Sequence, residues 1–240
     1  MIIGDKIKKK IEDTPDGVIL TIGDFDVDMQ CQGALVKALN RLVDQGTLQR
    51  LSKGKYYKPR KTIFGTLKPA TEEITKDFLM KNGKLVGYIT GNRAFALMGL
   101  TTQITSSILI GTSRYRHPLT RGDCVISFLQ QYNPITEENI PLLRILDALK
   151  CVREIPANSP DSVVTQLGGL IRALSKTEQG KLIELAVNYT SYVRALLGAI
   201  MEQNNIDGAG LLKKYLNGTT NYKLSISEQA LPNKKNWNIL

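Results

Sequence analysis

Three side chains along one predicted helix could read the edges of DNA bases. Lys37, Asn40 and Arg41 lie on the polar arc of residues 30–46. Arginine can bind guanine O6 and N7 together, and asparagine can bind adenine in the same bidentate way. Two further polar side chains, Gln30 and Gln32, stand at the entrance of this helix. The pattern predicts base contacts, and the alternative is an ordinary solvated helix face.

The opposite arc of the same segment is apolar. At about 100° per residue, one face of a helix gathers its apolar side chains, which here are Ala34, Leu35, Ala38, Leu39, Leu42 and Val43. Gly46 follows as a natural left-handed cap. One face of the helix can therefore pack while the other meets a ligand.

A basic hairpin is predicted directly after this helix. Residues 47–51 and 55–58 are strand-like and are joined through the turn residues 52–54. Residues 48–68 hold seven basic side chains and no acidic one, which suits phosphates or a minor groove. The predicted phosphate contacts are Arg50, Lys53, Lys55, Lys58, Arg60 and Lys61.

Upstream elements complete a recognisable order. Residues 2–13 show the pattern of an amphipathic helix, and residues 14–17 are predicted to be a turn. Residues 18–21 are predicted to be a short strand, and residues 22–28 could hold one helical turn. Helix, strand, short helix, second helix and two-stranded wing is the order of a winged helix, a variant of helix-turn-helix. We expect a winged-helix domain at residues 1–61.

The rest of the chain predicts an α+β protein. Pro59 ends the predicted wing within residues 58–61, and residues 62–69 look like a linker. A second domain is expected at residues 70–218, mixed α/β up to about residue 130 and then mainly helical. The turn-rich residues 219–240 are expected to be a tail.

Composition bounds the class of protein. The chain has 240 residues, 42% of them hydrophobic, and a net charge of +10, which favours nucleic acid or an anionic surface as partner. Residues 1–69 carry 13 basic and 8 acidic side chains, so the positive charge is expected to be densest there. No signal peptide or membrane span is predicted, and a cytoplasmic location is expected.

Other motifs give no catalytic, metal or cofactor site. Asp24, Asp26 and Asp28 resemble the start of a calcium loop, but the required glycine and glutamate are absent at the sixth and twelfth positions. His117, the sole histidine, has no recognisable catalytic partner. Three widely spaced cysteines predict reduced thiols rather than disulfides or zinc.

The chain resembles the AbiEi-type antitoxin and transcriptional-regulator family of type IV toxin-antitoxin systems. In the amino-terminal part the resemblance rests on residues 7–11, 21–25, 36–46 and 51–57. In the second domain it rests on residues 91–103, Gly-Asn-Arg-Ala-Phe-Ala-Leu-Met-Gly-Leu-Thr-Thr-Gln. This last string is the more family-specific.

The resemblance implies a two-domain protein without enzymatic activity. Its winged helix would repress its own operon at inverted repeats in double-stranded DNA, and its carboxy-terminal domain would counter a nucleotidyltransferase-like toxin of an abortive infection system. Two other classes remain open. An enzyme such as a nuclease would need a carboxylate and lysine cluster in the second domain, and a protein-interaction module without DNA binding would show a flat salt dependence.

Overall fold

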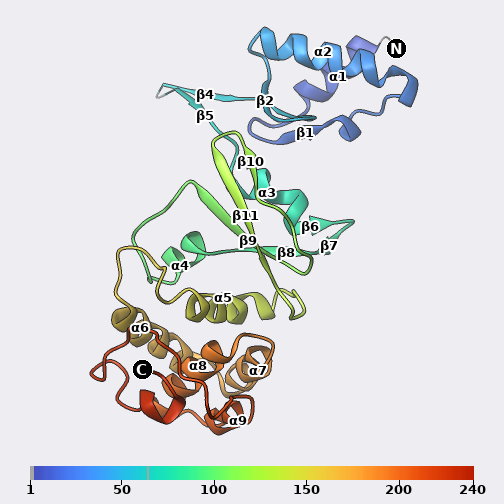
Figure 1. Ribbon diagram of the computed structural model, residues 1–240. Helices are drawn as coiled ribbons and strands as arrows, with labels where there is room; N and C mark the ends of the chain where they lie inside the picture. The colour runs from blue at the N-terminus through green and yellow to red at the C-terminus, as the bar shows by residue number, and fades with distance from the viewer. Residues whose placement is uncertain (1–2, 64) are drawn as a thin grey trace. The chain divides into compact units, whose positions relative to one another are not determined.

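The computed structural model describes residues 3–63 and 65–240, and its mixed α and β composition confirms the predicted α+β class. The chain divides into two compact units (Figure 1). Unit 1 comprises Met1–Asp77 and Thr120–Cys124, and unit 2 comprises Phe78–Leu119 and Val125–Leu240. Each unit is described by itself.

Unit 1 contains the element order that the sequence predicts. In chain order the elements are α1 (Ile3–Glu12), β1 (Ile19–Thr21), the 3-10 turns η1 (Ile22–Asp24) and η2 (Met29–Cys31), α2 (Gln32–Asp44), β2 (Gln49–Ser52) and β3 (Lys55–Tyr57). The three strands form an antiparallel sheet in the order β1-β3-β2, with Leu20 opposite Tyr56.

Apolar spacing explains how these elements pack. Ile7 and Ile11 of α1 are buried, and Leu35 and Leu39 of α2 are completely buried in the same core. Burial of such side chains stabilises a domain by about 1.5 to 3 kcal/mol each. Gly46 has a φ of +73° at the end of α2, as its predicted role as a cap requires.

The expected linker is a hairpin instead. Residues 60–62 and 65–67 form β4 (Arg60–Thr62) and β5 (Gly65–Leu67), an antiparallel pair. Almost every described side chain on this pair is solvent-exposed. The described residues of this pair have no buried face, so the sequence shows no alternation of apolar and polar side chains there. A local pattern of this kind resembles that of a linker.

The first unit also extends beyond the expected boundary at residue 61. Helix α3 (Thr71–Leu79) begins in it, and the turn at residues 120–124 joins it from far along the chain. There the Arg121 guanidinium is buried and donates to the carbonyl of Ile74, and the N–H of Gly122 donates to the carbonyl of Leu51 at 3.0 Å. These contacts are non-local, so a scan of local patterns could not find them.

The sheet of unit 2 has one parallel and one antiparallel pairing among its described registers. Strand β9 (Ser107–Thr112) lies between β11 (Cys124–Gln130), which is parallel to it, and β8 (Gly87–Thr90), which is antiparallel. In the sheet order β10-β11-β9-β8, the edge strand β10 (Leu119–Arg121) includes two residues that are counted with unit 1. Unit 2 also contains the hairpin of β6 (Met80–Lys81) with β7 (Lys84–Leu85) and the helix α4 (Asn92–Leu97).

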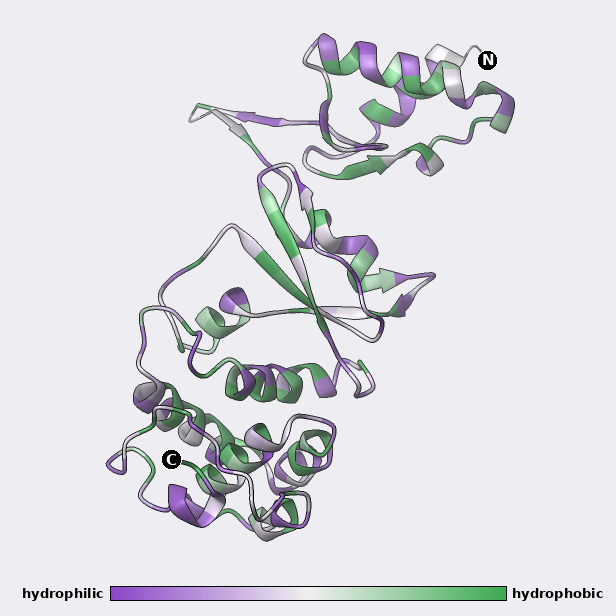
Figure 2. Ribbon diagram, viewed as in Figure 1, coloured by the Kyte–Doolittle hydropathy of each residue, from purple (hydrophilic) through white to green (hydrophobic). Residues whose placement is uncertain are grey.

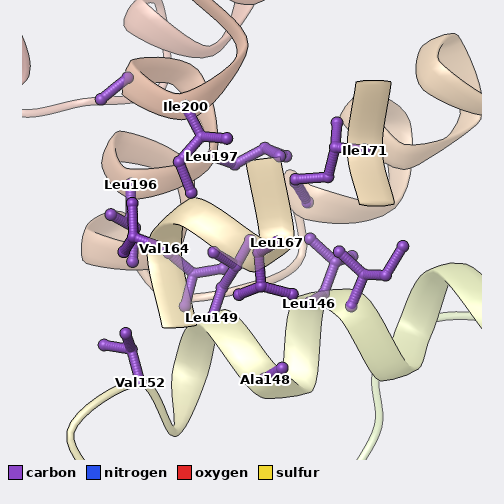
Figure 3. Packing of buried hydrophobic residues seen from close by; sticks show 14 of the residues in the cluster. Leu146, Ala148, Leu149, Val152, Val164, Leu167, Ile171, Leu196, Leu197 and Ile200 are labelled. Carbon is purple, nitrogen blue, oxygen red and sulfur yellow. The ribbon is translucent and has the colours of Figure 1, made fainter. Parts of the chain in front are cut away.

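Helices then dominate the chain, as predicted for the part that follows the mixed α/β region. They are α5 (Asn139–Lys150), α6 (Pro160–Ala173), α7 (Lys176–Ala186), α8 (Ser191–Gln203) and α9 (Ala209–Lys213). Figure 3 shows Leu149 of α5, Leu167 of α6 and Leu197 of α8 packed in one core. Ser175 and Glu178 form the capping box that begins α7. No helix in the described part of the chain is both long and apolar enough to cross a membrane.

The expected carboxy-terminal tail is part of the core. Residues 219–240 bury Leu231, Trp237 and Ile239 almost completely, and the 3-10 turn η3 (Lys234–Trp237) carries the indole against α8. These apolar side chains follow neither a helical nor a strand period, so no recognisable pattern marks them in the sequence. The Trp237 indole packs against Gly198 of α8.

A buried polar cluster lies under the helices of unit 2. The Asp147 carboxylate accepts hydrogen bonds from the Tyr88 hydroxyl at 2.8 Å, the Thr90 hydroxyl at 2.7 Å and the Tyr189 hydroxyl at 2.8 Å. The Gln131 amide donates to both tyrosine oxygens. Asp147 is fully buried. Without hydrogen bonds from these hydroxyl groups, its burial would destabilise the fold.

Candidate nucleic-acid interface

The exposed arc of α2 carries the three predicted base-reading side chains. Lys37, Asn40 and Arg41 are solvent-exposed, while Leu35 and Leu39 on the opposite arc are buried. Figure 2 shows this division of α2 into hydrophilic and hydrophobic residues. Neither Lys37 nor Arg41 has an ion-pair partner among the described residues. The arc therefore presents cationic and amide groups to solvent.

The three side chains differ in what surrounds them. The Asn40 amide oxygen accepts a hydrogen bond from the Tyr56 hydroxyl at 3.2 Å, which ties this residue to strand β3. Arg41 lies on the other flank, where it lines a groove with Lys8 of α1. Lys37 lies between these flanks on the helical wheel. The face therefore runs from the β-sheet to α1.

The predicted helix entrance is a 3-10 turn. Gln30 lies within η2, and Gln32 is the first residue of α2, so the helix begins two residues later than predicted. Both side chains are exposed. They remain available to a ligand at the amino-terminal end of α2.

Two of the predicted phosphate contacts are already paired with acids. The Lys55 ammonium lies 2.9 Å from the Asp77 carboxylate and is only 19% exposed, and the Lys58 ammonium lies 3.1 Å from Asp16. Both acids lie outside the acid-free stretch of residues 48–68. The tertiary fold therefore neutralises cations that the sequence alone left unpaired.

Asp77 is the centre of this arrangement. Burial alone would raise the pKa of its carboxyl, but hydrogen bonds from Arg121 and Lys55 outweigh burial and hold the pKa below its ordinary value of 3.8. Two guanidinium nitrogens of Arg121 contact the two carboxylate oxygens. Asp77 thus connects the β2–β3 hairpin to α3 and to the turn at residues 120–124.

Replacing Asp77 by asparagine should lower the free energy of unfolding by about 1.5 kcal/mol at neutral pH. This is the low end of the range for hydrogen bonds to a charged group, since the carboxylate is half-exposed and screened. A depressed pKa stabilises the fold above 3.8 and loses that contribution as the pH falls through the folded value. Denaturant titrations of wild type and variant should therefore converge in acid.

The matched control is Asp123→Asn, which removes an exposed pair with Lys68. It should leave the unfolding midpoint unchanged. Equal effects of both substitutions, or a gap between wild type and Asp77→Asn that widens in acid, would contradict the role given to Asp77.

Four of the predicted phosphate contacts remain exposed and without an ion-pair partner in the described parts of the chain. They are Arg50, Lys53, Arg60 and Lys61. Arg50 and Lys53 belong to the β2–β3 hairpin, and Arg60 and Lys61 belong to β4. The predicted phosphate contacts that remain available to a ligand are therefore divided between two hairpins.

Net charge does not single out unit 1. It holds 15 basic and 12 acidic side chains, a net charge of +3, and unit 2 holds 17 and 10, a net charge of +7. Residues 1–69 alone carry a net charge of +5, but residues 70–77 add three acidic side chains and one basic one, which brings unit 1 to +3. What distinguishes unit 1 is the local grouping of unpaired cations on α1, α2 and the hairpins.

Side chains considered for other chemistry have local structural partners. The Asp24 carboxylate accepts hydrogen bonds from the Thr21 N–H and hydroxyl at 2.6 and 2.7 Å, which makes it a cap of η1. The exposed His117 ring stacks edge-on against Tyr115. The three cysteines are free and half-buried.

Comparison with known proteins places the chain in a family and a fold. The model of DUF6088, a family of unknown function, matches residues 6–153. The chain is similar to the crystal structure of the RV2827C protein from Mycobacterium tuberculosis, with a TM-score of 0.54 and 13% identity over 95% of this chain and 86% of that one. This likeness shows a shared fold. The curated proteins gave no match.

Proposed function

The chain belongs to DUF6088, a family of unknown function, and from unit 1 we propose that it binds double-stranded DNA in a sequence-dependent way. The observation that carries this proposal is the two-sided helix α2. Its inner arc is locked into a core, and its outer arc presents Lys37, Asn40 and Arg41 without an acidic partner among the residues described. A rigid helix with such a face suits the major groove.

The surrounding elements support a winged-helix interpretation. Helix α1 packs on α2, and the β1-β3-β2 sheet follows with its hairpin. Gln30 and Gln32 would lie at the entrance of the recognition helix. Lys53 and Arg50 would contact phosphates. Lys55 and Lys58 would mainly stabilise the hairpin, because each forms an ion pair, with Asp77 and Asp16 respectively.

We further propose repression as the consequence of binding, at an inverted-repeat operator of the protein's own operon. The support is the resemblance to AbiEi-type regulators, which also implies an antitoxin role against a nucleotidyltransferase-like toxin and the absence of enzymatic activity. That role would fall to unit 2, and a cytoplasmic location would follow from it. A growth-rescue assay with the product of the adjacent gene tests the antitoxin part.

DNA binding is tested by gel shift of the full chain on its own promoter and on random DNA. Arg41→Ala should weaken promoter binding by about 1 to 3 kcal/mol and random-DNA binding by less, if the guanidinium reads a base. The matched control is Arg172→Ala, an exposed helical arginine of unit 2, which should leave both affinities unchanged.

Three outcomes would count against parts of this proposal. Equal losses on both DNAs would make Arg41 a phosphate contact. No binding of the wild type even at low salt would reject DNA binding and favour a protein-interaction module. Cleavage of the DNA in the presence of magnesium would favour a nuclease.

A further inference from the structure

A second basic hairpin stands apart from the winged-helix pattern. Arg60 pairs with Leu67, Lys61 with Thr66, and Thr62 with Gly65 across β4 and β5. The Thr62 hydroxyl donates to the Gly65 carbonyl at 2.9 Å. Figure 1 shows this pair extending away from the helices of unit 1. The described residues of this pair have the local hydrogen bonds of an ordered hairpin, and none of them is buried.

The end of this hairpin exposes an apolar side chain. Ile63 is 94% exposed and Leu67 is 47% exposed, whereas the basic side chains beside them, Arg60 and Lys61, are exposed and unpaired within the described residues. An apolar side chain beside unpaired cations at the end of a protruding hairpin suits a partner that combines negative charge outside with an apolar interior.

Stacked base pairs between two phosphate backbones have this combination. Proteins that enter the minor groove place arginine or lysine along it and wedge an apolar side chain between base steps, which kinks the duplex. The minor groove is about 6 Å wide before it is opened, too narrow for two strands side by side with their side chains, so only the end of the hairpin would enter it. Ile63 lies near that end, is 94% exposed and is a suitable apolar wedge.

The neighbouring β2–β3 hairpin is less free to take this role. Lys55 is held by Asp77, and the Leu51 carbonyl accepts a hydrogen bond from the Gly122 N–H. Leu51 itself is buried. Of the two hairpins of unit 1 that the structure describes, β4–β5 is the one with an exposed apolar end.

We propose that the β4–β5 hairpin enters the minor groove of the duplex that α2 contacts, with Arg60 and Lys61 on phosphates and Ile63 wedged between base pairs. The duplex is bent at that step. This inference rests on the proposed DNA binding and adds a second contact, a deformation of the DNA and a preference for flexible base steps such as TA.

The wedge is tested by measuring DNA bending with the full chain. Promoter DNA labelled at both ends should show increased energy transfer on binding of the wild type. Ile63→Ser should lose more than half of that change, while its affinity falls less than tenfold and its salt dependence is unaltered. The matched control, Leu97→Ser, replaces an exposed leucine of unit 2 that is 86% exposed and should bend DNA as the wild type does.

The cations are tested by the salt dependence of the same binding. The double variant Arg60→Ala and Lys61→Ala should lower the slope of log affinity against log salt by about one to two. The matched control is the double variant Lys81→Ala and Lys84→Ala on the exposed β6–β7 hairpin of unit 2. It should keep the wild-type slope.

The outcomes separate this inference from the proposed function. Wild-type binding with no bend, or the same bend with Ile63→Ser, overturns the wedge and leaves DNA binding by α2 intact. Absence of any DNA binding overturns both. Binding to phosphatidylserine vesicles that Ile63→Ser abolishes, without DNA bending, overturns the wedge in favour of a membrane contact.

Discussion

Replacement of Trp237 by alanine is expected to destabilise unit 2 by about 3 to 5 kcal/mol, the usual cost of removing a buried aromatic side chain. The indole is 1% exposed and its N–H donates to the Glu202 carboxylate. It fills the space over Gly198 on α8, where an added Cβ would lie 2.1 Å from the ring. Chemical denaturation followed by tryptophan-independent circular dichroism measures the loss.

Two further variants test this prediction. Gly198→Ala should destabilise the same contact from the other side by about 1 to 3 kcal/mol, because overpacking forces backbone or ring shifts. Lys235→Ala, which removes an exposed pair with Glu228 in the same segment, should leave the midpoint unchanged. A Trp237→Ala protein as stable as the Lys235→Ala protein would show that residues 219–240 do not belong to the core.

Asp147→Ala is expected to cost about 3 kcal/mol or more. The substitution leaves the hydroxyls of Tyr88, Thr90 and Tyr189 without their acceptor, and each buried hydroxyl without a partner costs about 1 to 3 kcal/mol. Thr102→Ala, at an exposed threonine of the same unit, is the control and should cost far less. Equal costs would show that the cluster tolerates the loss.

The same carboxyl gives a pH dependence with a definite sign. Burial raises the pKa of Asp147 above its ordinary value of 3.8, although hydrogen bonds from Thr90, Tyr88 and Tyr189 oppose the rise. A raised pKa stabilises the fold fully below 3.8 and loses that contribution as the pH rises through the folded value.

Wild type should therefore lose stability relative to Asp147→Asn as the pH rises from about 4 toward neutrality. The comparison with the variant cancels the contribution of Asp77, which has the opposite sign. Denaturant titrations at several pH values measure the difference between the two proteins. A difference that is constant with pH would contradict the raised pKa.

Local patterns predicted the elements that carry the candidate interface. The spacing of Ile7 and Ile11, and of Leu35 and Leu39, requires helices whose apolar faces pack together, and the structure buries all four. Gly46 and Gly54 mark the helix end and the hairpin turn, and both have positive φ. Such features depend on residues close in sequence, and so the chain itself displays them.

Tertiary contacts decided which charges remain available. Lys55 and Lys58 look free in the acid-free stretch, but folding pairs them with Asp77 and Asp16. The hairpin of Arg60–Thr62 and Gly65–Leu67 has no buried face among its described residues. The sequence therefore has no periodic apolar residues that would predict its two strands.

The sequence by itself therefore determined the α+β class, the faces of α1 and α2, and the positions of the basic side chains. Only the tertiary structure decided which cations are neutralised, where unit 1 ends, and that residues 219–240 pack through Trp237 against Gly198. The physical reason is range. Periodicity and turn chemistry act over a few residues, whereas ion pairing and shape complementarity join residues that the chain brings together only when it folds.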